Sequence, residues 1–330
     1  MTVCVSVVVP TYRRNDLLDR CLTALAAQAY PPDTYEIVVA DDAAACETER
    51  LVASWAARAP CAVRYIPVIG TQGPAAARNR GWSAARGEII AFTDDDCVPD
   101  PGWLRAGVAA FGCSISDDAE RAVAAVFGRI VVPLPPQPTD HARDTAGLEI
   151  AEHATANCFY RRDALCAVGG FDERFTAAWR EDSDLAFTLL ERHARIVWAP
   201  EAVVVHPVRA ARWGVSVSQQ RKSMYNALLY KKHPALYRTR VQSSPPWHYY
   251  RIVGALLMAL VGCVSGHRPV ALLGVGAWFG MTADFCAKRL RGTSRAPDHL
   301  AEMAVTSAAI PLLSVYWRLR GAFTYRVFFL

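Results

Sequence analysis

Three adjacent aspartates, Asp94, Asp95 and Asp96, directly follow the apolar run "EIIAFT". Carboxylates this close repel one another unless a positive group or water lies beside them. One interpretation is that they hold a hard divalent cation that also binds a substrate diphosphate. Mg²⁺ and Mn²⁺ take oxygen ligands and keep positions open for phosphate oxygens. The alternatives are a solvated loop that caps a helix and an isolated calcium-type site.

A second acidic group, in the segment "WREDSD", contains Glu181, Asp182 and Asp184 and precedes an apolar helical pattern. A carboxylate within hydrogen-bond reach of a hydroxyl can take its proton as a general base. Acidic residues are also favoured at a helix N-terminus by the helix dipole alone. The pattern therefore leaves a catalytic and a structural role open. His206, which follows "AVVV", is either a structural histidine or a further cation ligand.

Alternating strand and helix patterns position these residues. Strand patterns in "VCVSVVV", "YEIVVADD", "AVRYIPV" and "EIIAFTDDD" are separated by helical patterns, with short connections. This alternation predicts an α/β fold with a Rossmann-like, mostly parallel sheet flanked by helices. Ligands of such sheets bind beyond the carboxyl ends of the strands. We therefore expect Pro10-Thr11-Tyr12, Asp41-Asp42 and the three aspartates to converge on one crevice.

The second half of the chain has a different composition. The whole chain carries a net charge of +5, yet 17 Lys and Arg face three Asp and Glu from residue 209 onward. A basic and apolar segment of this kind favours an anionic membrane surface over nucleic acid as its partner. The ten cysteines show no metal-type spacing and are expected to be small buried apolar residues in a reducing cytosol.

The chain is expected to divide into a catalytic domain at 1–212, a basic interfacial helix and linker at 213–248, and membrane-associated helices at 249–330. Within the last part, 249–287 reads as a hairpin of two apolar helices, each near the lower limit of about 20 residues needed to span a bilayer. The alternative is an interfacial or dimer-forming helix pair. Residues 300–318, which include Pro311, read as an interfacial helix.

Five segments occur in an order and at a spacing that match a known family: "VVVPTYRR", "EIVVADDA", "GPAAARNRGWSAARGEIIAFTDDDCVPD", "TANCFYRRDAL…GGFDERF" and "WREDSDLAFTLL". From about residue 3 to 206 the chain resembles the family 2 glycosyltransferases of the GT-A fold, of the membrane-associated bacterial type. The resemblance implies an α/β GT-A catalytic domain with a C-terminal helical, membrane-associated region.

The resemblance also implies roles for matching residues. Asp42 would accept a hydrogen bond from the base imide, Asp182 would be the general base of an inverting reaction, and Asp95 would face the ribose or sugar. The remaining nucleotide-binding residues would be Pro10, Thr11, Tyr12, Arg14, Asp41, Gly73, Arg78, Asn79 and Asp94. Asp94, Asp96 and His206 would bind Mn²⁺ or Mg²⁺. Asn157, Trp179 and Glu181 would shape the sugar and acceptor pocket.

The expected function is therefore an inverting transfer of a sugar from a nucleotide-sugar donor to a lipid-linked or cell-envelope saccharide. A UDP-sugar is favoured and a dTDP-sugar is possible, since both bases carry an imide. Processive relatives carry a Q-x-x-R-W segment, whereas the nearest match here, "SQQRKS", has no Trp; we expect a non-processive enzyme. The expected location is the cell membrane, with the catalytic domain on the cytoplasmic side. The alternative is a non-catalytic membrane adaptor that senses nucleotide sugar.

Overall fold

The computed structural model describes residues 3–112 and 122–329. The chain forms two compact units. The first comprises Met1–Pro133 and Ala146–Val208, and the second comprises Leu134–Thr145 and Arg209–Leu330. A short internal segment thus belongs to the same unit as the C-terminal third of the chain.

The first unit is built on an eight-stranded mixed sheet with the strand order β3-β2-β1-β4-β7-β6-β8-β5. Strands β3, β2, β1 and β4 are all parallel, β7 pairs antiparallel with both β4 and β6, and β6 pairs parallel with β8. The strands are β1 (Val5–Thr11), β2 (Tyr35–Asp41), β3 (Ala62–Pro67), β4 (Ile89–Phe92), β5 (Val98–Pro99), β6 (Val123–Val131), β7 (Cys158–Arg161) and β8 (Arg195–Val205).

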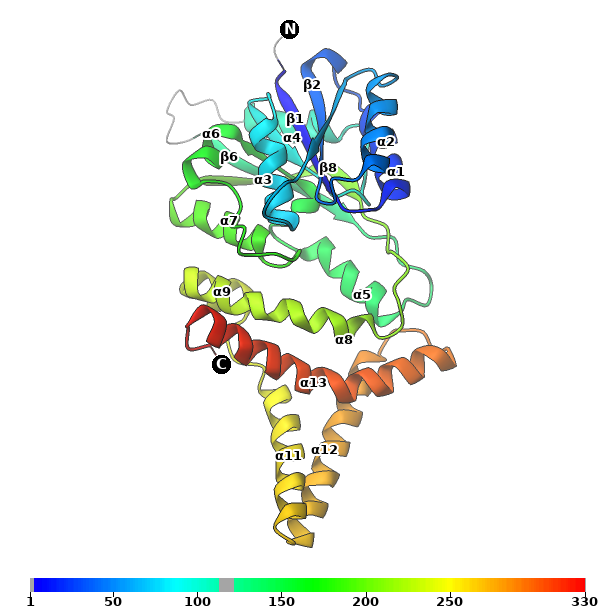
Figure 1. Cartoon of the computed structure of the whole chain (residues 1–330), viewed down its shortest axis with the longest axis vertical. Coiled ribbons are helices and arrows are strands. Elements are labelled where there is room, and N and C mark those ends of the chain that lie inside the picture. The colour runs from blue at the N-terminus through cyan, green and yellow to red at the C-terminus, as the bar shows by residue number, and fades with distance from the viewer. Residues whose placement is uncertain (1–2, 113–121, 330) are drawn as a thin grey trace. The chain divides into compact units, whose positions relative to one another are not determined.

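Helices flank this sheet (Figure 1). They are α1 (Asn15–Ala26), α2 (Cys46–Ala56), α3 (Pro74–Ala84), α4 (Trp103–Gly112), α6 (Arg162–Val168) and α7 (Glu181–Glu191). Helix α1 buries one stripe of residues at helical spacing, Leu18, Cys21, Leu22 and Leu25. These join the buried valines of β1 in one hydrophobic core. The expected strand–helix alternation and mostly parallel arrangement of β1 to β4 are confirmed in this part of the chain.

The segments "RIVW" and "AVVVH", expected as two short strands, form the single strand β8. Its register against β6 shifts between Gly128 and Arg129, which marks a bulge. The side-chain amide of Asn157 donates to Arg129 O at 2.9 Å and to Ala202 O at 2.8 Å at this irregularity. A Cβ atom at Gly128 would collide with that amide, so glycine leaves the room that Asn157 occupies.

The second unit is helical. Its elements are α5 (Asp140–Ala146), α8 (Val215–Gln219), a 3₁₀ turn at Gln220–Met224, α9 (Tyr225–Lys232), α10 (Pro234–Leu236), a π-helical turn at Tyr237–Val241, α11 (Trp247–Val264), α12 (Arg268–Arg289) and α13 (Pro297–Tyr325). Helix α13 is longer than the expected interfacial helix and continues through Pro311. It contacts α9 and the turn before it, and also α11 and α12.

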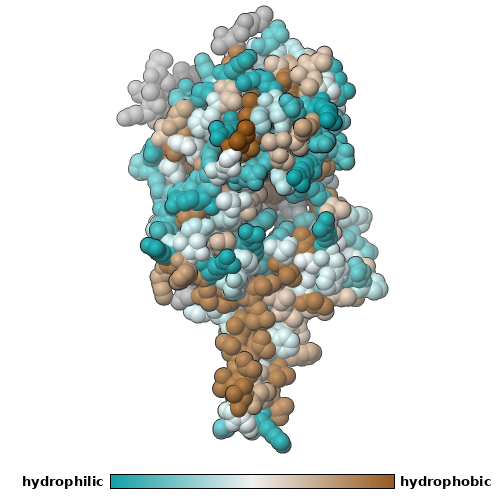
Figure 2. Space-filling model, in the orientation of Figure 1, coloured by the Kyte–Doolittle hydropathy of each residue, from teal (hydrophilic) through white to brown (hydrophobic). Residues whose placement is uncertain are grey.

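Helices α11 and α12 pack as an antiparallel pair through glycines, since a Cβ at Gly262 or Gly274 would collide with the backbone of the other helix. Large apolar side chains face outward from the pair: Val264 is 82% exposed and Leu272 is 73% exposed. Figure 2 shows a hydrophobic, brown surface along most of the hairpin. Helices of 18 and 22 residues are about 27 and 33 Å long, against about 30 Å for a bilayer core.

Three helices in the described part of the chain, α11, α12 and α13, are long and apolar enough to cross a membrane. Helix α13 is the most enclosed of them, with 39% of its apolar window buried against 11% for α12. The three apolar helices indicate membrane association.

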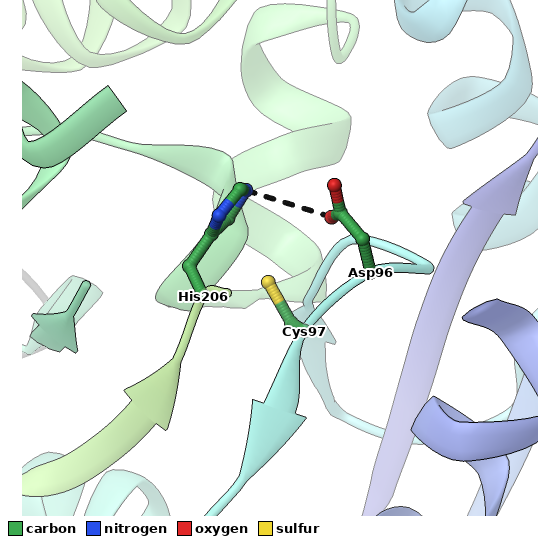
Figure 3. Close-up of side chains that lie close together, drawn as sticks. All are labelled: Asp96, Cys97 and His206. Carbon is green, nitrogen blue, oxygen red and sulfur yellow. Dashed lines mark ion pairs between the residues drawn. The ribbon is translucent and has the colours of Figure 1, made fainter. Parts of the chain in front are cut away.

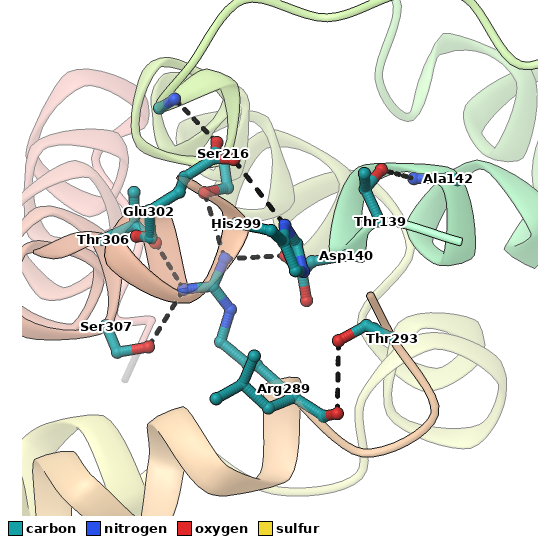
Figure 4. Close-up of polar contacts among 12 residues, drawn as sticks. Thr139, Asp140, Ala142, Ser216, Arg289, Thr293, His299, Glu302, Thr306 and Ser307 are labelled. Carbon is teal, nitrogen blue, oxygen red and sulfur yellow. Dashed lines mark hydrogen bonds and ion pairs between the residues drawn. The ribbon is translucent and has the colours of Figure 1, made fainter. Parts of the chain in front are cut away.

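A buried guanidinium holds the internal segment 134–145 within the second unit (Figure 4). Arg289, at the end of α12, donates to Asp140 Oδ2 at 2.7 Å, to Thr306 Oγ1 at 2.7 Å and to Ser307 Oγ at 3.0 Å. It also donates to Ser216 Oγ at 3.1 Å, so one side chain joins α5, α8, α12 and α13. Charge-assisted hydrogen bonds of this kind fix orientation as well as adding stability.

Candidate active site

The three aspartates lie in the turn between β4 and β5, and each lies beside a basic side chain. Asp94 Oδ1 pairs with Arg78 Nη2 at 2.8 Å, and Asp95 Oδ1 pairs with Arg14 Nη1 at 3.1 Å. Asp96 Oδ1 lies 3.5 Å from His206 Nε2. The three carboxyl groups thus meet two arginines and one histidine from three distant segments: the β1–α1 loop, helix α3 and the end of β8.

Arg78 joins two carboxyl groups of the site, those of Asp94 and Glu181. Its other terminal nitrogen pairs with Glu181 Oε1 at 2.9 Å, and both residues are buried. Burial acts to lower the pKa of Arg78, but the carboxylates of Asp94 and Glu181 outweigh it and raise that pKa. Burial also acts to raise the pKa of Asp94, and here Arg78, His206 and Arg14 outweigh it and lower that pKa. Both groups are therefore charged.

Two other carboxyls of the site behave differently. Burial raises the pKa of Glu181 to about 7, helped by the neighbouring Asp182 and opposed by Arg78. Burial likewise raises the pKa of Asp95 to about 6, although Arg14 and a 2.8 Å hydrogen bond from Thr11 Oγ1 oppose the shift. Perturbed carboxyls gathered at one edge of a sheet are typical of a functional site.

Asp182 occupies the first turn of α7, and the residue before that helix, Arg180, has a left-handed backbone with φ of 77°. The backbone N–H and hydroxyl of Ser183 both donate to Asp182 Oδ1, at 2.6 and 3.2 Å. Among the described residues, Oδ2 of this half-buried carboxylate has no hydrogen-bond partner. Trp179, which is 38% exposed, lies shortly before helix α7 in the sequence. The guanidinium of Arg180 stacks 4.6 Å from the Trp179 ring.

Asp42 and Gly73 lie together: both oxygens of the Asp42 carboxylate accept from the Gly73 backbone N–H, at 2.9 and 3.0 Å. Gly73 precedes α3 with φ of 114°, a conformation that favours glycine. Tyr12, 47% exposed, follows β1 with the Arg13 guanidinium 5.5 Å from its ring, and Pro10 lies in β1 beside Ala40.

Three expected contact residues are instead occupied by structural hydrogen bonds. Asp41 is fully buried and accepts from the N–H groups of Ala43 and Ala45, so it shapes the turn before α2. Asn79 is bonded in both directions to the backbone of Phe171. Asn157 is 1% exposed, and its Oδ1 accepts from Trp103 Nε1 at 2.8 Å. Each of these side chains positions a loop or strand near the site.

A group of three potential cation ligands lies at the end of β8 (Figure 3). Ligand atoms of Asp96, Cys97 and His206 all lie within 4.8 Å of one another, and all three residues are buried. His206 Nδ1 is buried without a hydrogen-bond partner among the described residues, which fits a site completed by another group. Asp94, expected as a ligand, lies against Arg78. Cys97 was not singled out by its sequence pattern, although it follows Asp96 directly.

The fold and the acidic edge of its parallel strands define the GT-A class. The mannosyltransferase PcManGT from Pyrobaculum calidifontis, solved with GDP-Man and Mn²⁺, superposes with a TM-score of 0.64 at 21% identity, covering 97% of this chain and 88% of that one. The Staphylococcus aureus TarS 1-349 complex with UDP-GlcNAc gives 0.52 at 17% identity, covering 96% and 92%. These similarities establish the fold.

Two family models match the sequence: "Glycosyl transferase family 2" over residues 6–166 and "Glycosyl transferase family group 2" over residues 143–319. The chain belongs to the family 2 glycosyltransferases, as its motifs predicted.

Curated relatives are similar over part of the chain. The pre-mycofactocin glycosyltransferase of Mycobacterium tuberculosis is 31% identical over 218 residues, which cover 62% of this chain and 43% of that protein. Glycosyltransferase AglE of Haloferax volcanii is 27% identical over 216 residues, covering 62% and 67%. The chain thus spans less than half the length of the mycobacterial relative.

Proposed function

We propose that the chain is a membrane-associated, inverting glycosyltransferase. It transfers a sugar from a nucleotide-diphosphate donor to a lipid-linked or cell-envelope saccharide, one sugar per encounter. The observation that carries the proposal is the open Oδ2 of Asp182 beside a charge-balanced network that reaches the three aspartates through Glu181, Arg78 and Asp94.

In the proposed reaction the acceptor hydroxyl oxygen attacks the anomeric carbon from the face opposite the diphosphate. The bond between that carbon and the diphosphate oxygen breaks, and Asp182 takes the hydroxyl proton. Ser183 holds Oδ1 of Asp182 through two hydrogen bonds, which leaves Oδ2 for the proton. Asp96 and His206 would hold a Mn²⁺ or Mg²⁺ ion, which neutralises the negative charge of the departing diphosphate when bound.

The nucleobase contact assigned to Asp42 depends on its anchoring. Because Gly73 N–H fixes the carboxylate, one of its oxygens can accept from an imide N–H without rearrangement. A UDP-sugar is therefore the proposed donor, with a dTDP-sugar as the possible alternative. Thr11 and Arg14 act indirectly, by holding the buried Asp95 in the turn that carries Asp96.

The proposed location is the cell membrane, with the catalytic unit on the cytoplasmic side. The ends of the α11–α12 hairpin that join the rest of the chain carry Arg251, Lys288 and Arg289, whereas its turn carries only His267 and Arg268. More positive charge at the joined ends agrees with a cytoplasmic position for those ends. The basic residues of the 3₁₀ turn Gln220–Met224 and of α9 then lie with the membrane lipids.

Calorimetric titration with UDP, dTDP and GDP, each with Mn²⁺ and again with EDTA, tests the donor site. We expect metal-dependent binding of UDP or dTDP in preference to GDP. Asp182→Asn should bind the same nucleotide as the wild-type chain yet lose transfer from labelled UDP-sugars to a membrane lipid extract. Asp163→Asn, an exposed change in α6, is the matched control and should keep both.

Wild-type turnover by Asp182→Asn would remove the proposed base. If the folded protein bound a nucleotide but transferred no sugar, the result would favour the non-catalytic adaptor that senses nucleotide sugar, and binding of none of the nucleotides would remove the proposed donor site.

A further inference from the structure

The group Asp96, Cys97 and His206 offers one oxygen, one sulfur and one nitrogen to a cation. Hard ions such as Mg²⁺ select oxygen ligands, whereas a thiolate selects softer ions such as Zn²⁺. Three protein ligands with a further position left open is also the usual composition of a catalytic zinc site. The sulfur therefore distinguishes this site chemically from one made of carboxylates alone.

The distances fit a shared ion. Ligands about 2.0–2.1 Å from a tetrahedral ion lie roughly 3.3–3.4 Å apart, and Asp96 Oδ1 already lies 3.5 Å from His206 Nε2. A sulfur about 2.3 Å from the same ion would lie roughly 3.6 Å from the other two ligand atoms. Because all three ligand atoms are within 4.8 Å of one another, Cys97 Sγ has at most about 1.2 Å to move.

Burial supports a built site. The side chains of Asp96 and His206 are 3% and 8% exposed, and Cys97 is fully buried. Figure 3 shows the sulfur between the imidazole and the carboxylate, which point toward one another. Cys97 immediately precedes β5, and the N–H of His206 donates to Val131 O on β6 at 2.8 Å, so backbone pairing fixes both residues.

We propose that Cys97 is a cation ligand and gives this site a preference for thiophilic divalent ions: Zn²⁺ or Cd²⁺ binds at Asp96, Cys97 and His206 more tightly than Mg²⁺. Binding forms a metal–sulfur bond, breaks the S–H bond and releases one proton to solvent, with no change in oxidation state. The position left open then accepts a diphosphate oxygen. Only this last statement rests on the proposed glycosyltransferase function.

A coordinating thiol is deprotonated outright, so Cys97 becomes a thiolate when an ion binds. A loaded site with one Asp carboxylate, one thiolate and a neutral imidazole balances the two charges of the ion.

The test is a Cd²⁺ titration of the full-length, detergent-solubilised protein without nucleotide, followed by the ultraviolet absorption of the thiolate–Cd²⁺ bond. We expect one equivalent of this absorption in the wild-type chain and in Cys166→Ser, which removes an exposed cysteine of α6. Cys97→Ser should lose it. X-ray absorption of the Zn²⁺ form should show one sulfur at about 2.3 Å.

Competition of Zn²⁺ against Mg²⁺ measures the preference. Loss of a direct ligand should weaken Zn²⁺ binding by roughly tenfold or more, at least as much as loss of an outer partner does. Unchanged absorption in Cys97→Ser, or a Zn²⁺ shell of nitrogen and oxygen alone, would overturn the proposal. If Cys97→Ser does not fold, His206→Ala replaces it and must weaken the absorption. Absence of nucleotide binding would bear on the proposed function and leave this result intact.

Discussion

Asn157 is the residue whose expected and observed surroundings differ most, and replacing it by alanine separates the two roles. As a sugar contact, its loss would lower the transfer rate without changing stability. In the structure its amide accepts from Trp103 Nε1 and donates to the carbonyls of Arg129 and Ala202. The change Asn157→Ala therefore leaves one buried donor and two acceptors without partners.

Each unsatisfied buried group costs about 1–3 kcal/mol. Allowing for partial relaxation, we expect Asn157→Ala to lower the free energy of unfolding by about 3–5 kcal/mol. For a unit of this size about 1 kcal/mol shifts the melting temperature by about 2–4 °C, which predicts a decrease of roughly 10 °C. Urea unfolding followed by tryptophan fluorescence measures the change, because Trp103 itself lies beside the substitution.

Asn15→Ala is the matched control. Asn15 accepts a single 3.0 Å hydrogen bond from Thr48 Oγ1, so its loss should cost about 1 kcal/mol. The reasoning would be refuted if Asn157→Ala unfolded at the wild-type urea concentration while its kcat/KM for donor fell. That outcome would indicate that Asn157 contacts the sugar, as its sequence motif suggested.

Two further predictions concern charge and helix packing. The pKa of Glu181, about 7 against an ordinary 4.5, means that folding favours the protonated form; its stabilising contribution is complete below pH 4.5 and is lost as the pH rises through 7. The unfolding free energy of Glu181→Gln should therefore fall less over that interval than that of the wild-type chain. In the hairpin, Gly274→Leu should separate α11 from α12 and lower the melting temperature in detergent. Gly276→Leu should not, since a Cβ at Gly276 meets no atom within 4 Å.

Parallel pH profiles for Glu181→Gln and the wild-type chain would contradict the assigned pKa. Equal melting temperatures of Gly274→Leu and Gly276→Leu would contradict the close contact of the two helices.

The parallel half of the fold follows from local sequence. The β-branched runs of β1 and β2 and the apolar stripe of α1 each predict their element without knowledge of the rest. Prediction was less complete where proline interrupts a pattern. Pro200 divides the sequence of β8 into two apparent strands, and Pro311 suggested a break in α13, because proline is rare inside either element. Pro200 lies in the bulge of β8, between the partners of Gly128 and Arg129, where proline is tolerated, and Pro311 is buried within α13.

The sequence predicted where the site lies, but it did not predict which side chains pair with one another there. The strand ends located Asp42 and Asp94–Asp96, because that follows from sheet topology. Asp94 pairs with Arg78 of α3, and Asp96 lies beside His206 at the end of β8. No local sequence pattern encodes these contacts. Likewise, the partners of Asn157 lie 28 to 54 residues away along the chain.

The segment 134–145 has a consequence for how the chain is made. It belongs to the second unit, and its Asp140 pairs with Arg289, 149 residues further along. A ribosome adding about 5–20 residues per second needs roughly 7–30 s to deliver that arginine. The first unit can complete its sheet during this interval, while α5 waits for its partner. A chain released before Arg289 would carry Asp140 without its arginine.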